Sequence, residues 1–306
     1  MNSFNINRFW KTFCWVVATN FRTLMMWTIG SAAGVFLLEM IIISIHDPYR
    51  NMLTKTAVNM DYIQSSYIGD LQNVSHLCLT ILVIAALIGL SSVFLNVNKK
   101  AKREAFLMLP ASNLEKFLSA VIYVTVVWTV SIFLAYCLGD TLRMVVRSLI
   151  YGNQWISTIP MMVKSFILIH FSYFGVIVPT WTRVMIVFMF VFGFAWAHSL
   201  YILGGTLLRK YSFVVSSLVM ILSFILAIVI GDKIGFNAFY VDAVVVKELG
   251  TGHDVNMYEQ KISFGGYMLS ILIPLVACFN YWASYHIFKA FQLISNKWTN
   301  YDILKR

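Results

Sequence analysis

The nearest approach to a catalytic cluster in this chain is formed by Asp140, Arg143, Arg147 and His170. Ionisable groups inside membrane segments mark functional sites, and intramembrane enzymes gather such groups at one leaflet. Charged residues also cap membrane spans at the level of the lipid headgroups, which is the commoner reason for their presence there. The cluster therefore leaves two interpretations open: an active site, or a polar cap at the end of a span.

Known catalytic and nucleotide-binding motifs are missing from the sequence. It contains no G-x-x-x-x-G-K-[ST], H-E-x-x-H, G-x-S-x-G or G-x-G-x-x-G. The six histidines are scattered, and the four cysteines stand apart from one another without a C-x-x-C pair. Metal sites need ligands at short, regular spacings. We therefore expect no enzymatic activity, no metal site and no cofactor held by this chain itself.

Two ionisable side chains, Glu39 and His198, lie inside long apolar runs. A carboxylate at the centre of a membrane span costs about 2.5 kcal/mol or more unless it is shielded, so Glu39 should face protein or water. It could line a substrate pathway, exchange a proton, or accept hydrogen bonds from buried partners. Both residues are candidates for polar positions along a pathway.

The composition places these residues in a polytopic membrane protein. Of 306 residues, 59% are hydrophobic and 12% are charged, whereas soluble domains carry about 25% charged residues. Apolar runs of about 20 residues are long enough to cross a bilayer as helices. We predict an all-α helical bundle, a single transmembrane domain over residues 1–306. Its six spans should lie near residues 24–45, 74–95, 117–138, 184–207, 213–230 and 264–288.

The segments outside these spans carry further signals. Residues 1–22 alternate aromatic and basic side chains, which is typical of a helix lying in the membrane interface. Gly30 and Gly34 form a G-x-x-x-G pattern that lets two helix backbones pack closely. Residues 139–183 and 231–263 should lie outside the cytoplasm, with a strand-like piece at 238–246. The apolar stretch 161–178 is interrupted by Lys164 and His170 and predicts an interfacial or re-entrant segment.

The distribution of charge sets the orientation. With both termini in the cytoplasm, six spans place the larger share of the 23 basic residues on the inner side, as the positive-inside rule requires. A seventh span over residues 161–178 would reverse every later segment and remove this bias. The net charge of +10 is then almost entirely cytoplasmic. Membrane orientation accounts for it, and we predict no nucleic-acid partner.

Residues 98–116 connect the second and third spans and form the most densely charged stretch. Pro110 ends an apolar run in this stretch because proline lacks the amide proton that a helix interior needs. Ser112 and Glu115 then form an S-x-x-E capping box that begins a new helix. The pattern predicts a short amphipathic helix, a break and the start of a span. It fits an ordinary basic cytoplasmic loop, or a docking element offered to a soluble partner.

The string REAFLMLPASNLEKFLSA in this stretch resembles a segment of many bacterial permease-like proteins, and so does AHSLYILGGTLLRK at the end of the fourth span. In layout, most of the chain is similar to the membrane-spanning permease subunit of a type 2 ABC exporter. The resemblance implies that residues 98–116 form a coupling helix docked on a separate ATPase subunit, which binds the ATP. The docking residues would be Lys99, Lys100, Lys102, Arg103, Glu104, Phe106 and Leu109.

The resemblance also implies the partners and location of the chain. It implies a second permease copy, identical or related, and surrounding lipid in a bacterial cytoplasmic membrane. The cargo would be a lipid, a peptide or a hydrophobic compound. Residues 231–263 depart from the family, which has two short re-entrant helices before the last span, because this segment is polar. A lipid-directed membrane enzyme and a non-transporting sensor or assembly protein remain as alternatives.

Overall fold

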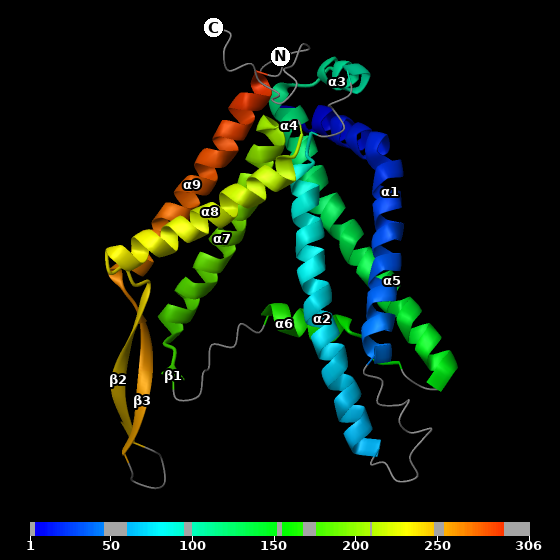
Figure 1. Ribbon diagram of the computed structural model, residues 1–306. Coiled ribbons are helices and arrows are strands. Elements are labelled where there is room, and N and C mark those ends of the chain that lie inside the picture. The colour runs from blue at the N-terminus through cyan, green and yellow to red at the C-terminus, as the bar shows by residue number, and fades with distance from the viewer. Residues whose placement is uncertain are drawn as a thin grey trace. The chain divides into compact units, whose positions relative to one another are not determined.

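The computed structural model describes residues 4–45, 60–94, 100–151, 155–167, 176–208, 210–247 and 254–290. Most of this part of the chain is helical, so the all-α prediction holds for its bulk (Figure 1). The elements, in order, are α1 (Ile6–Ile45), α2 (Met60–Ser91), α3 (Lys100–Leu107), α4 (Asn113–Ile122), the π-helical turn η3 (Tyr123–Val127), α5 (Trp128–Tyr151), α6 (Ile159–Ile167), β1 (Val176–Ile177), α7 (Thr180–Leu207), α8 (Ser212–Lys233), β2 (Phe239–Lys247), β3 (Asp254–Ile262) and α9 (Phe264–Lys289).

Six helices in the described residues are long and apolar enough to cross a membrane, as predicted. They are Ile6–Ile45, Ile63–Ser91, Asn113–Ile150, Thr180–Leu207, Ser212–Lys233 and Phe264–Lys289. The stretch predicted to be interfacial or re-entrant contains the nine-residue helix α6, which is too short to span, and the two-residue strand β1. Residues 168–175 between them lie outside the described part of the chain.

Several helices extend beyond the spans predicted within them. Residues 6–45 form one continuous helix, so the expected interfacial segment and the first span are joined in α1. The second helix begins at Met60, well before residue 74, and the third continues to Tyr151, beyond residue 138. Polar side chains ended the predicted spans too early. Some of these side chains, such as Asp140 and Arg143, are buried against each other, which allows the helices to continue.

A three-stranded sheet is the main departure from an all-helical chain. Strands β2 and β3 form an antiparallel hairpin from Phe239↔Ile262 to Lys247↔Asp254, and β1 pairs with β3 in parallel. The predicted strand-like piece at residues 238–246 is thus confirmed as β2. On the hairpin, Lys261 Nζ lies 3.0 Å from Asp242 Oδ2 and 3.3 Å from Glu259 Oε2. The β2–β3 hairpin occupies most of the polar segment between α8 and α9.

The chain forms two compact units, and the single transmembrane domain stays a prediction. The α1–α5 unit consists of Phe4–Gly89 and Leu118–Ile169, and the α7–α9 unit includes Leu90–Phe117 and His170–Arg306. In the first, α1 and α5 lie side by side (Figure 1). They lie close together at Gly139, where a Cβ atom would lie 2.8 Å from the carbonyl oxygen of Ala32.

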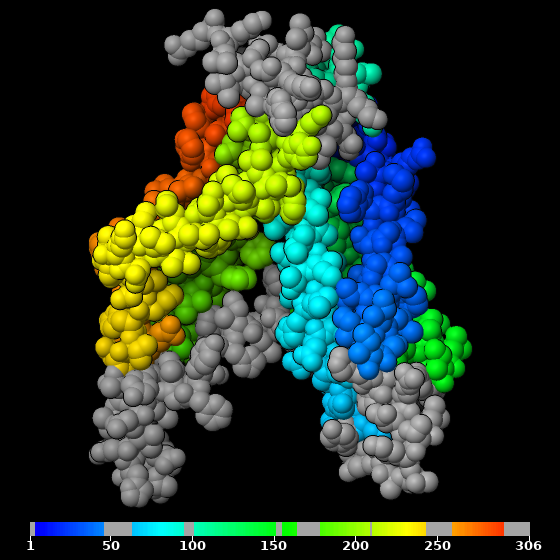
Figure 2. Space-filling view, in the orientation of Figure 1, coloured from blue at the N-terminus to red at the C-terminus, as the bar shows by residue number. Residues whose placement is uncertain are grey.

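The α7–α9 unit is built on the pairing of α7 with α9 (Figure 1). Helix α8 contacts α7 and buries little besides Ser212 and Ser216, so its apolar side chains remain exposed along its length (Figure 2). A helix that is apolar on all sides needs a nonpolar environment, which a bilayer supplies. Gly205 allows the end of α7 to pack close to Ser91, because a Cβ atom there would lie 2.7 Å from the Ser91 carbonyl oxygen.

Candidate functional site

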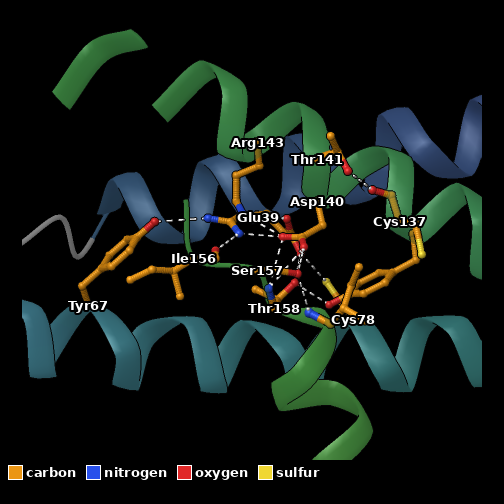
Figure 3. A network of polar contacts seen from close by, with 12 residues as sticks. Glu39, Tyr67, Cys78, Cys137, Asp140, Thr141, Arg143, Ile156, Ser157 and Thr158 are labelled. Carbon is orange, nitrogen blue, oxygen red and sulfur yellow. Dashed lines mark hydrogen bonds and ion pairs between the residues drawn. The ribbon is translucent and has the colours of Figure 1, made fainter. Parts of the chain in front are cut away.

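A buried polar cluster lies inside the α1–α5 unit (Figure 3). Glu39 comes from α1, Tyr67 from α2, and Asp140 and Arg143 from α5, while Thr158 stands just before α6. The side chains of these five residues are 0% exposed. We call this group, with Ser157, the Arg143 cluster. It brings Glu39 together with Asp140 and Arg143, which lie about a hundred residues later in the sequence.

Arg143 is the centre of the cluster. Its Nε donates to Glu39 Oε2 at 3.0 Å and its Nη2 donates to Asp140 Oδ1 at 2.6 Å. The guanidinium makes two further hydrogen bonds, since Nη1 donates to the Tyr67 hydroxyl at 3.1 Å and Nη2 to the Ile156 carbonyl at 2.7 Å. A planar guanidinium with five N–H donors suits such a site, and lysine could not reproduce the pattern.

The two carboxylates are also hydrogen-bonded to the segment before α6. Asp140 accepts from the Ser157 hydroxyl and from the Thr158 backbone N–H at 3.2 Å. Glu39 accepts from the Thr158 hydroxyl at 3.1 Å, and the Cys78 thiol lies 4.0 Å from the same oxygen. Two buried carboxylates are tolerated here because each one accepts hydrogen bonds and faces a cation.

Helical spacing explains how α5 can supply acidic and basic side chains to the same site. Asp140, Arg143 and Arg147 are three and four residues apart and therefore share one face of the helix. Arg147 is 1% exposed, and its guanidinium carbon lies 5.3 Å from the centre of the Tyr67 ring, a cation–π contact. Glu39 and Asp140 match the two arginines in formal charge. The buried set is therefore close to electrically neutral.

The arrangement supports a structural role better than a catalytic one. The carboxylates and guanidinium are 0% exposed and are bonded to one another, so a substrate arriving from water or lipid would not meet them in this conformation. Of the predicted catalytic cluster, Asp140 and Arg143 are brought together with Arg147 nearby, whereas His170 lies outside the described residues. Within those residues no group of three or more metal-binding side chains occurs.

The predicted polar pathway residues both have partners. Glu39 belongs to the Arg143 cluster, in agreement with its interpretation as a buried hydrogen-bonding group. His198 Nδ1 lies 2.6 Å from the Tyr281 hydroxyl across the α7–α9 pair. Beside it, Asn280 Nδ2 donates to Ser199 Oγ at 3.1 Å. Polar bonds of this kind hold membrane helices together. A role in a pathway stays a prediction.

The predicted glycine motif lies on an exposed face of α1. Gly30 and Gly34 are exposed, and a Cβ atom built at either would meet no described atom within 4 Å. The close helix approach that the motif predicts is found instead at Gly139 of α5. The sequence could not show which of these glycines packs against another helix, because it gives the small residue but not the helix that lies opposite.

The second candidate site is α3, the eight-residue helix between the second and third spans. The predicted break at Pro110 and the capping box are confirmed. The Ser112 backbone N–H donates to Glu115 Oε2 at 2.8 Å, and the Glu115 N–H donates to Ser112 Oγ at 3.3 Å. Lys116 Nζ also donates to the Leu107 carbonyl at 2.6 Å, which fixes the end of α3 to the start of α4.

The predicted docking residues differ in their accessibility. Arg103 and Phe106 are buried, at 3% and 1% exposed, and so belong to the inner face of α3. Lys102, Glu104 and Leu109 are half-buried, α3 begins at Lys100, and Lys99 lies outside the described residues. The outward face is formed by Ala101, Ala105 and Met108, of which Met108 is 83% exposed. A partner would therefore touch Ala105 and Met108 rather than Phe106.

Several residues of the Arg143 cluster were missed from the sequence. Tyr67, Ser157 and Thr158 lie in segments that looked like ordinary polar connections. A usable signal was the need of Glu39 for a cation. Arg143 was a suitable candidate, because it shares a helix face with Asp140 close to the end of a predicted span.

Comparison of the chain with protein-family models, with curated proteins and with solved structures gives no match in any of the three. Function is therefore inferred from the residues and their contacts.

Proposed function

We propose that this chain is the membrane-spanning permease subunit of an ABC exporter, driven by a separate ATPase subunit. Two permease copies, identical or related, would enclose a pathway for a lipid, a peptide or a hydrophobic compound. The setting would be a bacterial cytoplasmic membrane with both termini inside. The chain itself would bind no ATP and catalyse no reaction.

The proposal rests on the position of α3 between two spans and on its buried and exposed faces. It is a short helix between two candidate spans, with its last residue, Leu107, hydrogen-bonded to Lys116 of α4 and an outer face left exposed. Its inner face is buried against its own unit, so a partner pressing on the outer face would meet a firm support. Four basic residues at positions 99–103 give this region a positive charge suited to an acidic ATPase surface.

The alternative of a lipid-directed enzyme receives less support. Its proposed groups Asp140 and Arg143 are completely buried and already paired. A non-transporting sensor or assembly protein would have the same helices, and it differs from the exporter in having no ATPase partner. Purification of the intact chain in mild detergent separates these functions.

We expect an ABC-type ATPase to co-purify with the chain and Met108→Glu to reduce its recovery at least about tenfold. A carboxylate at the centre of an interface leaves an unpaired charge against the acidic partner surface. Recovery is measured by mass spectrometry, and ATP hydrolysis by the purified complex. The buried Phe106 is unsuitable for this test, because its truncation would loosen α3 itself.

Ile234→Glu is the matched control. Ile234 ends α8 and is 68% exposed, and the same apolar-to-acidic change there lies on the predicted opposite side of the membrane. ATPase recovery should remain at the wild-type level in this variant. Equal recovery with Met108→Glu and wild type would exclude α3 as the docking site, and absence of any ATPase from the wild-type preparation would count against the exporter.

A further inference from the structure

An aromatic cluster lies on the inner face of α3, within the α7–α9 unit. It consists of Phe94 after α2, Phe106 of α3, Phe117 of α4, and Tyr285 and Phe288 of α9. The four phenylalanine side chains are between 1% and 6% exposed. Residues 94–117 and the distant last span therefore share one small aromatic core.

Phe288 is the centre of this aromatic cluster. Its ring centroid lies 5.1 Å from that of Phe94 in a stacked arrangement, 5.7 Å from Phe117, and 6.2 Å from Phe106 in an edge-on arrangement. Phe117 also packs edge-on against Tyr285 at 5.5 Å. Offset and edge-on ring pairs are favourable beyond the area that they bury. Phe288 thus joins α3 to the last span by direct contact.

The face of α9 that carries Phe288 is the same face that packs inside its unit. Asn280, Ser284 and Phe288 are buried at helical spacing, and Asn280 is bonded to Ser199 of α7. Phe288 therefore cannot be displaced without moving the buried face of α9. On the other side of the contact, Phe106 is the largest fully buried apolar side chain of α3.

We infer that Phe288 locks α3 to α9, so that the two helices move as one element. Closely packed rings leave no space into which Phe106 could move without moving Phe288. This inference deepens the proposed function and rests on it for its meaning. Under that function, this contact passes to α9 the movement that the ATPase imposes on α3.

Hydrogen exchange on the full chain tests the lock without any partner. The protein is placed in bilayer discs of phosphatidylethanolamine and phosphatidylglycerol, and exchange is read by mass spectrometry. Phe288→Ala should speed exchange of the α3 amides at least about tenfold, because local opening exposes them. Phe106→Ala should speed exchange at the end of α9. In the double variant Phe106→Ala/Phe288→Ala, exchange of α3 and α9 should be little faster than in the single variants, because both remove the same contact.

Phe279→Ala is the control, because Phe279 lies on α9 and is 60% exposed. It should leave α3 unchanged, and peptides of the α1–α5 unit should exchange normally in every variant. If Phe288→Ala disturbs the whole chain, the more conservative Phe288→Leu, which removes the ring but keeps a branched apolar side chain, gives the decisive result: a smaller increase in exchange, confined to α3. Wild-type exchange of α3 in both Phe288 variants would overturn the lock.

The ATPase complex separates this inference from the proposed function. Phe288→Ala should still retain the ATPase that co-purifies with wild type, because Ala105 and Met108 keep their exposed face. The Phe288→Ala complex should not show the change in hydrogen exchange of α9 that ATP produces in the wild-type complex. An undiminished ATP-dependent change would overturn the inference while the exporter stands. Absence of an ATPase would remove the exporter, and the partner-free exchange would still decide the lock.

Discussion

Replacing Arg143 with methionine should lower the free energy of unfolding of the α1–α5 unit by about 3–5 kcal/mol, because it leaves two carboxylates buried without their cation. Arg143 makes ion pairs with both Glu39 and Asp140, and all three are 0% exposed. Its hydrogen bonds to Tyr67 and the Ile156 carbonyl would be lost as well. Unfolding is followed by denaturant titration of the purified protein in detergent.

Two further variants show whether burial causes the loss. Arg143→Lys keeps the charge but cannot form the same set of bonds, so its stability should lie between those of the wild type and Arg143→Met. Lys261→Met removes a cation from the exposed ion pairs with Asp242 and Glu259, and it should have little measurable effect. If Arg143→Met is as stable as Lys261→Met, the Arg143 cluster does not hold the unit together.

A second large effect is expected at Gly139, where alanine should cost about 1–3 kcal/mol of stability through overpacking. The added methyl group would lie 2.8 Å from the Ala32 carbonyl oxygen and 2.9 Å from Val35 Cβ. Neither contact can be relieved by rotation of a long side chain, so α1 and α5 must separate. Separation of the two helices would also move Asp140, the next residue of α5, away from its hydrogen-bond partners. The same detergent titration measures it.

Gly30→Ala is the matched control, since nothing described lies within 4 Å of the added atom. In a helix, alanine is favoured over glycine by about 1 kcal/mol, so this variant should be as stable as wild type or slightly more stable. A larger loss at Gly30 than at Gly139 would contradict the packing of α1 against α5. Such a loss would point to a close helix partner at the Gly30 and Gly34 face.

The sequence was sufficient for features that depend on local patterns. Six apolar runs predicted six spans, and Pro110 with Ser112 and Glu115 predicted the end of one helix and the cap of the next. These signals act within a few residues of each other, and the physical rule for each is short-range. The strand-like piece predicted at residues 238–246, found as β2, is of the same kind.

Features that depend on distant partners could not be predicted. Asp140 ended the predicted third span because a lone carboxylate disfavours the membrane, yet in the structure Arg143 and the segment before α6 satisfy it. Phe106 appeared to be a docking residue because nothing in the sequence showed Phe288 beside it. In both cases the partner decides the environment, and one sequence does not name the partner.

The orientation of α3 is the most direct test of the whole account. Met108 is replaced with cysteine in a chain whose Cys14, Cys78, Cys137 and Cys278 have been changed to alanine, and Ile234→Cys is made in the same background. A membrane-impermeant thiol reagent is then applied to intact spheroplasts. We predict labelling of the Ile234→Cys variant from outside, and labelling of the Met108→Cys variant after permeabilisation alone. Ready labelling of the Met108→Cys variant in intact spheroplasts would place α3 outside the cytoplasm and contradict its role as the ATPase docking helix.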